Sequence, residues 1–178
     1  MRSPRYFGAM QGAAHGLDPV ASVLFVCAGN ICRSPTAEGV FRAAAARAGF
    51  AARIAADSAG IGDWHTGSPP DRRAIQAARR RGYDLTALRA RQVEIGDFTR
   101  FGWILAMDRS NLRSLEAMRP HDFAGHLGLL LDLAPELRTR EVPDPYYGGP
   151  DGFDHVLDLI EAASAVLLAR VQHSLPPP

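Results

Sequence analysis

A cysteine and an arginine six residues apart, Cys27 and Arg33, lie where an apolar run gives way to a helical pattern. Residues 20–26 are rich in β-branched and aromatic side chains, which is typical of a buried strand. Ser34 suits a helix N-cap and Pro35 suits a first helical position. Between this strand and this helix, backbone N–H groups of a short loop would converge above the helix N-terminus, where an anion is favoured. The spacing therefore predicts an anion-binding loop that carries a cysteine.

A thiolate is itself an anion, so the same field should keep Cys27 ionised at neutral pH and make it a nucleophile. The planar guanidinium of Arg33 matches two oxygens of a phosphate group. Gly29 permits close approach of the backbone, Asn30 tolerates a left-handed conformation, and Ser34 can donate its hydroxyl to the thiolate. A structural cysteine in an ordinary turn is the alternative interpretation. The preceding strand, the Gly-Asn pair and the Ser-Pro start together argue against it.

Composition excludes several other classes. The 178-residue chain has a net charge of +1, which indicates neither a nucleic-acid nor a membrane partner. Its two cysteines do not make a disulfide scaffold, so a reduced, cytoplasmic setting is expected. No apolar run is long enough for a membrane span, and no signal peptide is visible. The His and Cys spacings fit no metal site, so we expect neither a metal nor a cofactor.

Strands and helices alternate along the chain. This order predicts a single α/β domain with a parallel sheet covered on both faces and a ligand site beyond the carboxyl ends of the strands. We expect the domain to span residues 22–173, after a disordered extension at 1–21 and before a frayed tail at 174–178. The run 128–133 does not distinguish strand from helix. Strands are predicted at 20–26, 53–59 and 103–107, and helices at 36–48, 70–81, 110–118 and 151–172.

The stretch VLFVCAGNICRSPTAEGVF resembles the low molecular weight protein tyrosine phosphatase family. The resemblance resumes at the motifs DSAG, ILAMDRSN and VPDPYY and covers about residues 23–171. It implies a four-stranded parallel sheet and hydrolysis of phosphotyrosine through a phosphocysteine intermediate. Cys27 would attack phosphorus, Arg33 would hold the phosphoryl oxygens, and Asp144 would be the general acid and then the base. Without the resemblance, an ordinary Asp-Pro turn would be the better interpretation of Asp144.

The resemblance also assigns a substrate slot and a supporting network. Trp64, Tyr146 and Tyr147 would wall the slot, and a slot this deep would favour tyrosine over serine. Many family members carry a histidine near the position of Leu88, and this leucine leaves one arm of the network in doubt. The residues implied to bind phosphate or to shape the loop are Ala28, Gly29, Asn30, Ile31, Cys32, Ser34, Ser58 and Asp108.

Family members use a second loop cysteine, here Cys32, to form a reversible disulfide with the nucleophile; a spectator cysteine is the alternative. Arsenate reductases of this fold need further cysteines, which this chain lacks. In related arginine phosphatases the position of Ile31 tends to be smaller and polar, and the second aromatic residue, here Tyr147, differs, so phosphotyrosine is favoured here. A non-catalytic phosphate-binding module would be expected to lose the nucleophile or the acid.

The expected partner is a protein that carries phosphotyrosine. By resemblance to bacterial members, a bacterial tyrosine kinase or a host protein is a candidate. A host substrate would require release without a signal peptide. A monomer is the expected oligomeric state.

Overall fold

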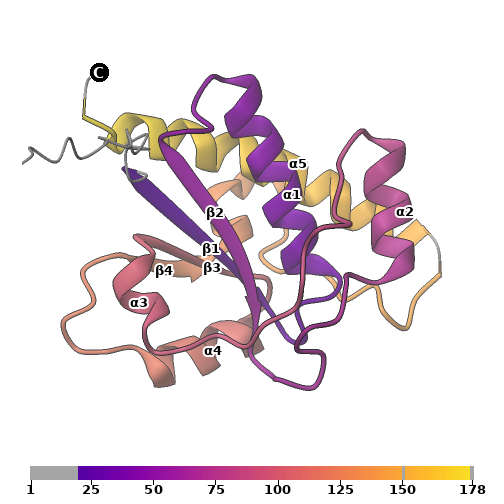
Figure 1. Ribbon diagram of the computed structural model, residues 1–178, viewed down its shortest axis with the longest axis horizontal. Coiled ribbons are helices and arrows are strands. Elements are labelled where there is room, and N and C mark those ends of the chain that lie inside the picture. Colours follow the sequence, from indigo (N-terminus) through magenta and orange to yellow (C-terminus); the bar gives the residue numbers. More distant parts are fainter. Residues whose placement is uncertain (1–19, 150, 177–178) are drawn as a thin grey trace, which may run out of the picture.

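The computed structural model describes residues 20–149 and 151–176. Its sheet has four parallel strands in the order β2-β1-β3-β4 (Figure 1). The three strands predicted from the sequence are confirmed to within one residue at each end. The strands are β1 (Ala21–Cys27), β2 (Ile54–Gly60), β3 (Trp103–Ala106) and β4 (His126–Leu129).

Helices cover both faces of this sheet, as predicted (Figure 1). Helix α1 and the long α5 lie against one face, and α2 packs beside them. The short α3 and α4 lie against the other face. The helices are α1 (Arg33–Arg47), α2 (Arg72–Arg80), α3 (Asp97–Arg100), α4 (Arg109–Met118) and α5 (Asp151–Ser174).

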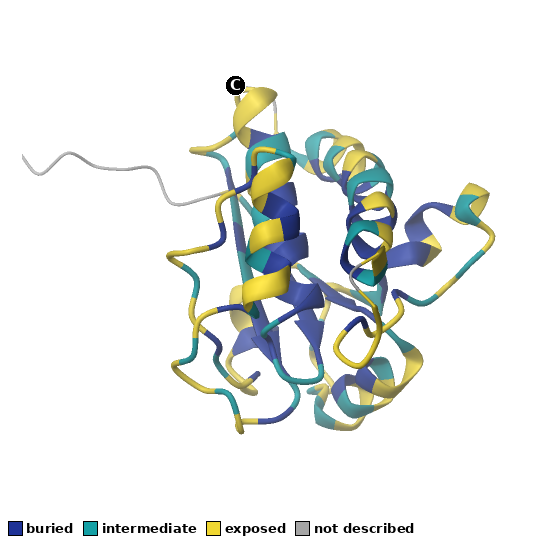
Figure 2. Cartoon of the chain, turned by 90° about the vertical axis from the view of Figure 1, so that its right-hand side faces the viewer, coloured by how far each residue is buried: buried dark blue, intermediate teal, exposed yellow. Residues whose placement is uncertain are grey.

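The central strand β1 divides its side chains between two hydrophobic cores. Val23, Phe25 and Cys27 belong to the core under α1 and α5. Leu24 and Val26 belong to the core under α3 and α4. Side chains of a strand alternate between faces, so a run that is apolar at every position must be buried on both sides. Figure 2 shows the resulting buried centre, with exposed residues on the outer sides of the helices.

The ambiguous run 128–133 contains two structures in succession. Strand β4 ends at Leu129, and a 3₁₀ helix, η1 (Leu130–Leu133), follows directly. A second 3₁₀ helix, η2 (Pro135–Leu137), comes next. The leucines of this run are buried whichever structure holds them, which is why hydrophobicity alone could not separate the two. The four-residue α3 was not predicted, because it is too short to show a helical period.

Chain topology places a crevice at the carboxyl ends of β1 and β3. After β1 the chain enters α1 on one face of the sheet, and after β3 it enters α4 on the other face. Adjacent parallel strands whose connections leave in opposite directions open a crevice between them. Cys27 is the last residue of β1, and Asp108 follows β3 by two residues. The fold thus brings these two side chains to the same edge.

The ends of the chain fall partly outside the described residues. The predicted extension lies almost wholly in residues 1–19, outside them. At the other end, Ser174 closes α5, and Arg53 donates to the carbonyl of Pro176 at 2.6 Å. Residues 177–178 of the predicted tail again lie outside the described part. Within the described ranges, no helix combines the length and apolarity that crossing a membrane requires.

Candidate active site

Cys27 ends β1, and its sulfur has two polar contacts. Its sulfur accepts a hydrogen bond from the backbone N–H of Asn30 at 3.3 Å and lies 3.0 Å from the hydroxyl oxygen of Ser34. Asn30 has a φ of 56°, in the left-handed region, as its residue type allows. Cys27 is 3% exposed. The loop 28–32 therefore turns its backbone back over the sulfur.

The start of α1 differs from the prediction. The helix begins at Arg33, and Cys32 is its N-cap residue, without a side-chain capping bond. The prediction that Ser34 caps this helix is wrong, because the fully buried Ser34 hydroxyl is engaged with Cys27 and Asn30 instead. Pro35 is the third helical residue, where the first turn still tolerates a missing N–H.

A chain of hydrogen bonds fixes the conformation of the loop. The side-chain amide of Asn30 donates to the hydroxyls of both Ser34 and Ser58 at 2.9 Å. Its carbonyl oxygen accepts from the backbone N–H of Arg91 at 2.9 Å. The hydroxyl of Ser58 in turn donates a hydrogen bond to the carboxylate of Glu38 at 2.6 Å. The Ser34 oxygen accepts from Asn30, so its own hydroxyl proton can be donated to the sulfur of Cys27 or to the carbonyl of Ala59.

Glu38 is a buried acid that sequence reasoning missed as a site residue. Its side chain is 2% exposed and accepts a hydrogen bond from Ser58 of the loop network. Burial raises the pKa of Glu38, while the Ser58 hydroxyl and Arg42 oppose that rise. Arg42, four residues later on the helix, pairs with it at 2.9 Å. That i, i+4 spacing was the signal available in the sequence.

Leu88 leaves no gap in the network. Its side chain packs against the core under α1 and α5 and does not take part in the hydrogen bonds that a histidine could make. Asn30 and Ser58 find their partners in Arg91 and Glu38 instead. Among the buried side-chain polar atoms of the described residues, only the hydroxyl of Ser164 lacks a partner, and it lies on α5.

Arg33 is buried and held by two carboxylates. Its Nη1 donates to Asp108 at 2.7 Å and to the carbonyl of Val142 at 3.0 Å. Its Nη2 donates to Asp144 at 3.2 Å. Asp108 is itself fixed, because its other oxygen caps α4 by accepting from the N–H of Asn111. The guanidinium is thus oriented before any substrate arrives.

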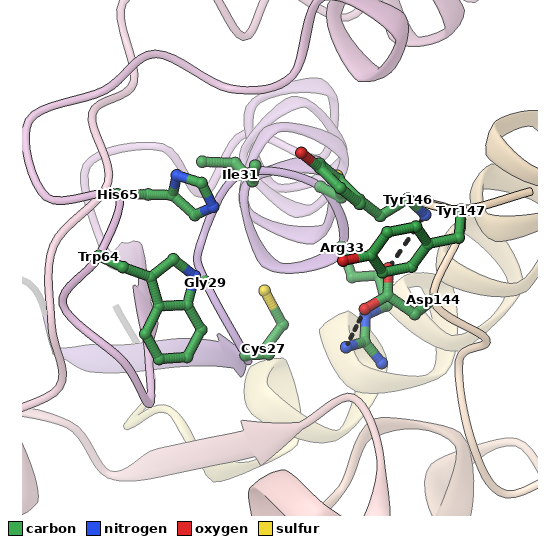
Figure 3. Close-up of a pocket in the computed structure, with 11 residues that line it drawn as sticks. Cys27, Gly29, Ile31, Arg33, Trp64, His65, Asp144, Tyr146 and Tyr147 are labelled. Atoms are coloured by element: carbon green, nitrogen blue, oxygen red, sulfur yellow. Dashed lines mark hydrogen bonds and ion pairs between the residues drawn. The ribbon is translucent and has the colours of Figure 1, made fainter.

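Cys27, Arg33 and Asp144 meet in one pocket of about 380 Å³. Figure 3 shows Trp64 and His65 on one side, Tyr146, Tyr147 and Asp144 on the other, and the sulfur of Cys27 between them. Of the predicted site residues, Asn30, Ser34, Ser58 and Asp108 support the pocket without lining it, whereas His65 lines it and was not predicted. The lining residues are Cys27, Ala28, Gly29, Ile31, Cys32, Arg33, Trp64, His65, Asp144, Tyr146 and Tyr147.

The two walls are more exposed than the floor. Trp64 is 64% exposed and Tyr147 is 95% exposed, whereas Arg33 is 3% exposed. Gly29 lets the Trp64 wall approach the loop. A Cβ atom at Gly29 would lie 2.8 Å from Cδ2 of His65 and 3.1 Å from Nε1 of Trp64. Glycine is needed here for close packing within the pocket.

Cys32 differs from Cys27 in its surroundings. It is buried and free, and no disulfide joins the two sulfurs. Burial, followed by the negative charges of Asp71, Cys27 and Asp144, raises the pKa of Cys32 to about 12, against the opposing effect of Arg73. Cys32 is therefore a thiol at neutral pH.

Comparison with known proteins identifies the family. Residues 22–176 match the family model of low molecular weight phosphotyrosine protein phosphatases. The chain belongs to this family. The low molecular weight protein-tyrosine-phosphatase YfkJ of Bacillus subtilis is 46% identical over 85% of this chain and 96% of its own. Its crystal structure superposes with a TM-score of 0.81, at 43% identity, over 92% of this chain and 98% of that one. This protein is therefore a hydrolase, a protein tyrosine phosphatase, and its substrates are proteins that carry phosphotyrosine.

Other relatives show how widely the fold is used. The low molecular weight protein-tyrosine-phosphatase of Streptomyces coelicolor is 44% identical over 86% of this phosphatase and 94% of its own chain. An arginine phosphatase of Drosophila has the same fold, with a TM-score of 0.79 and 30% identity over 84% of this chain and 97% of its own. The fold alone therefore does not choose between phosphotyrosine and phosphoarginine.

Proposed function

We propose that this phosphatase hydrolyses phosphotyrosine through a covalent intermediate on Cys27. The observation that carries the proposal is the meeting of three groups in one pocket. The Cys27 sulfur accepts from a loop amide, and buried Arg33 lies beside it with a hydrogen bond to Asp144. A nucleophile, a fixed cation and a proton carrier are what transfer of a phosphoryl group from a phenol requires.

The reaction would proceed in two displacements. The thiolate of Cys27 attacks phosphorus, a sulfur–phosphorus bond forms, and the bond to the tyrosine oxygen breaks as Asp144 gives that oxygen a proton. Water then attacks the phosphorus of the phosphocysteine while Asp144 takes a proton from that water. The sulfur–phosphorus bond breaks, and the thiolate and inorganic phosphate are released. Arg33 would hold the phosphoryl oxygens throughout and would stabilise the charge that spreads over them.

The contacts of Arg33 and Asp144 support these roles. Asp108 holds one nitrogen of Arg33, so the guanidinium keeps its orientation when a phosphate group takes the place of Asp144 on the other nitrogen. Asp144 is 49% exposed, and its second oxygen accepts from the N–H of Tyr146. A carboxyl group at the mouth of the pocket can exchange protons with both the leaving group and water.

The shape of the pocket favours a phosphorylated ring. Trp64 and Tyr147 form opposite walls above a floor that contains the buried Cys27 (Figure 3). A flat ring can lie between aromatic walls, whereas phosphoserine is too short to bring its phosphate to the floor. Ile31 lines the pocket with an apolar side chain, which suits a phenyl ring better than the polar guanidinium of phosphoarginine. These features favour phosphotyrosine over phosphoarginine.

The setting and the regulation of the enzyme are further parts of the proposal. Both cysteines are free, which suits a reduced cytoplasmic compartment. On oxidation by peroxide, Cys27 would form a sulfenic acid. The Cys32 thiol would lose its proton and attack the Cys27 sulfur, a sulfur–sulfur bond would form, and the hydroxide that leaves would take up a proton to become water. A bacterial tyrosine kinase or a host protein would be the substrate, and the enzyme would act as a monomer.

A rate assay on matched peptides tests this function. Peptides that carry phosphotyrosine, phosphoarginine or phosphoserine would be compared at equal concentration, with Cys27→Ser as the control for phosphate release by contaminants. We expect turnover of the phosphotyrosine peptide alone to be substantial and to vanish in the variant. Preferred turnover of phosphoarginine would overturn the substrate assignment, and full activity of Cys27→Ser would overturn the mechanism.

A further inference from the structure

Arg73 connects three segments around the pocket without lining it. It is the second residue of α2, and its side chain is 44% exposed. Its Nε and Nη2 donate to the two carboxylate oxygens of Asp71 at 3.0 and 2.8 Å. Its Nη1 donates to the backbone carbonyl of Tyr146 at 3.0 Å. Its guanidinium carbon lies 5.3 Å from the centre of the Tyr146 ring and 4.9 Å from that of Phe153.

Asp71 links this arginine to the loop that carries the nucleophile. The backbone N–H of Asp71 donates to the carbonyl of Ile31 at 2.7 Å. Its carboxylate caps α2 by accepting from the N–H of Arg73 at 2.8 Å, and the pairing with the Arg73 side chain lowers the pKa of Asp71. Asp71 thus keeps its charge at neutral pH and stays fixed to the loop 28–32.

Tyr146 links the same arginine to Asp144. The N–H of Tyr146 donates to one oxygen of Asp144 at 3.1 Å, and the carbonyl of Tyr146 accepts from Arg73. These contacts form a chain from Ile31 through Asp71, Arg73 and Tyr146 to Asp144. Arg33 follows the loop 28–32 and donates to Asp144, so it completes the chain into a ring.

Asp144 is held directly by Arg33 and indirectly by Arg73 through Tyr146, and the two contacts should respond differently when a substrate binds. Arg33 must turn its donors toward the phosphoryl oxygens, which compete with Asp144 for them. The contact from Arg73 is made to the backbone carbonyl of Tyr146, not to the carboxylate, and Arg73 does not line the pocket. It therefore persists when phosphate is bound, at the stage when the carboxyl must protonate the leaving oxygen.

We propose that Arg73 is a positioning residue for Asp144. Through Asp71 and the carbonyl of Tyr146, it fixes the distance between the proton carrier and the loop that binds phosphate. The inference rests on the proposed role of Asp144 as the general acid. Arg73 touches neither the substrate nor the reacting atoms, so its loss should affect proton transfer to the leaving group and leave phosphate binding intact.

The dependence of kcat/KM on the leaving group tests this role. Aryl phosphates from activated nitrophenyl to plain phenyl phosphate would be compared in wild type, Arg73→Ala, Arg73→Lys and Asp144→Ala. Plain phenolate needs a proton most, so we expect Arg73→Ala to slow phenyl phosphate about tenfold and nitrophenyl phosphate less than about threefold. Arg73→Lys keeps the charge but lacks the fork that reaches both partners, so it should fall between wild type and Arg73→Ala.

Arg72→Ala is the matched control. Arg72 is the exposed neighbour on the same helix, and its side chain makes no hydrogen bond or ion pair within residues 20–149 and 151–176. This variant should retain the wild-type dependence on the leaving group. Vanadate affinity and thermal unfolding would verify that each variant folds and still binds a phosphate analogue.

The double variant Arg73→Ala with Asp144→Ala decides whether Arg73 acts through Asp144. We expect its dependence on the leaving group to match that of Asp144→Ala alone. An equal loss for all aryl phosphates in Arg73→Ala, or no loss, would overturn the positioning role while leaving the acid role of Asp144 intact. Asp144→Ala with an unchanged dependence would instead overturn the acid assignment, and the role of Arg73 with it.

Discussion

The floor and the walls of the pocket are held in different ways. On the floor, Cys27 and Arg33 are each 3% exposed, and their polar atoms contact groups that are themselves hydrogen-bonded. On the walls, Trp64 and Tyr147 are mostly exposed. Asp144, at 49% exposure, lies between these extremes. The nucleophile and the phosphate-binding arginine are thus buried and held by hydrogen bonds, whereas the aromatic rings proposed to contact the substrate are exposed.

Replacing the nucleophile should produce the largest effect. Cys27→Ser removes the sulfur but keeps the loop, so kcat should fall by about 10,000-fold or more while vanadate binding survives in part. Steady-state kinetics and calorimetric titration with vanadate would measure the two properties. Cys32→Ser is the matched control and should keep most of the activity. Comparable activity of the two variants would show that the floor does not carry the chemistry.

Replacing Asp144 should have a smaller effect that depends on the substrate. Asp144→Ala should slow a phosphotyrosine peptide by about 100-fold or more, because its phenolate leaves poorly without a proton. An activated nitrophenyl phosphate should lose much less, since its phenolate leaves unaided. Measuring kcat/KM for both substrates in one preparation checks this prediction. If both fell by the same factor, Asp144 would belong with the structural residues of the floor.

Disulfide closure after peroxide treatment should depend on pH. Cys32 must lose a proton to attack the sulfenic acid of Cys27. Burial and the charges of Asp71 and Asp144 still raise the pKa of Cys32 after Cys27 has been oxidised. Because the thiolate fraction grows with pH below such a raised pKa, the closure rate should rise about tenfold per pH unit across the neutral range. Rapid quenching and mass spectrometry would measure it. A rate independent of pH would mean that Cys32 is already ionised at neutral pH, which would contradict its raised pKa.

Shortening the walls should have the smallest effect. Trp64→Ala or Tyr147→Ala should raise KM for a phosphotyrosine peptide by about three- to tenfold, since each ring contributes about 1 kcal/mol of contact with the substrate ring. The kcat for nitrophenyl phosphate should change less than twofold. Peptide kinetics for both variants would check this. A collapse of kcat would instead make the walls part of the catalytic arrangement.

Much of the floor could be predicted from the sequence because its residues lie close together in the chain. Cys27, Asn30, Ser34 and Arg33 fall within eight positions, between a strand and a helix that have clear patterns. Asp108 and Asp144 were found only by resemblance to the family. Each is an ordinary acid in its own segment, and only the topology brings it to Arg33.

Other features had weak or misleading signals. Ser34 has the residue type of a cap, but its burial gives the hydroxyl a different partner, and no local pattern shows burial of a single serine. In the sequence, Glu38 has the pattern of an ordinary helical acid paired with Arg42, and only the tertiary structure buries it. His65 and Arg73 are exposed or partly exposed residues whose importance depends on contacts with distant segments. Such contacts arise from tertiary packing and leave no periodic trace in the sequence.

The position of Cys27 at the end of β1 has a consequence for how the molecule opens. Strand β1 pairs with β2 along its whole length and with β3 along its middle, and it is covered by both cores. Its amides should exchange with deuterium only when the entire domain unfolds, whereas those of residues 146–149 should exchange through local fluctuations. The backbone at Cys27 should therefore stay in place as long as the domain is folded, whereas residues 146–149 at the rim of the pocket can open many times before the domain unfolds.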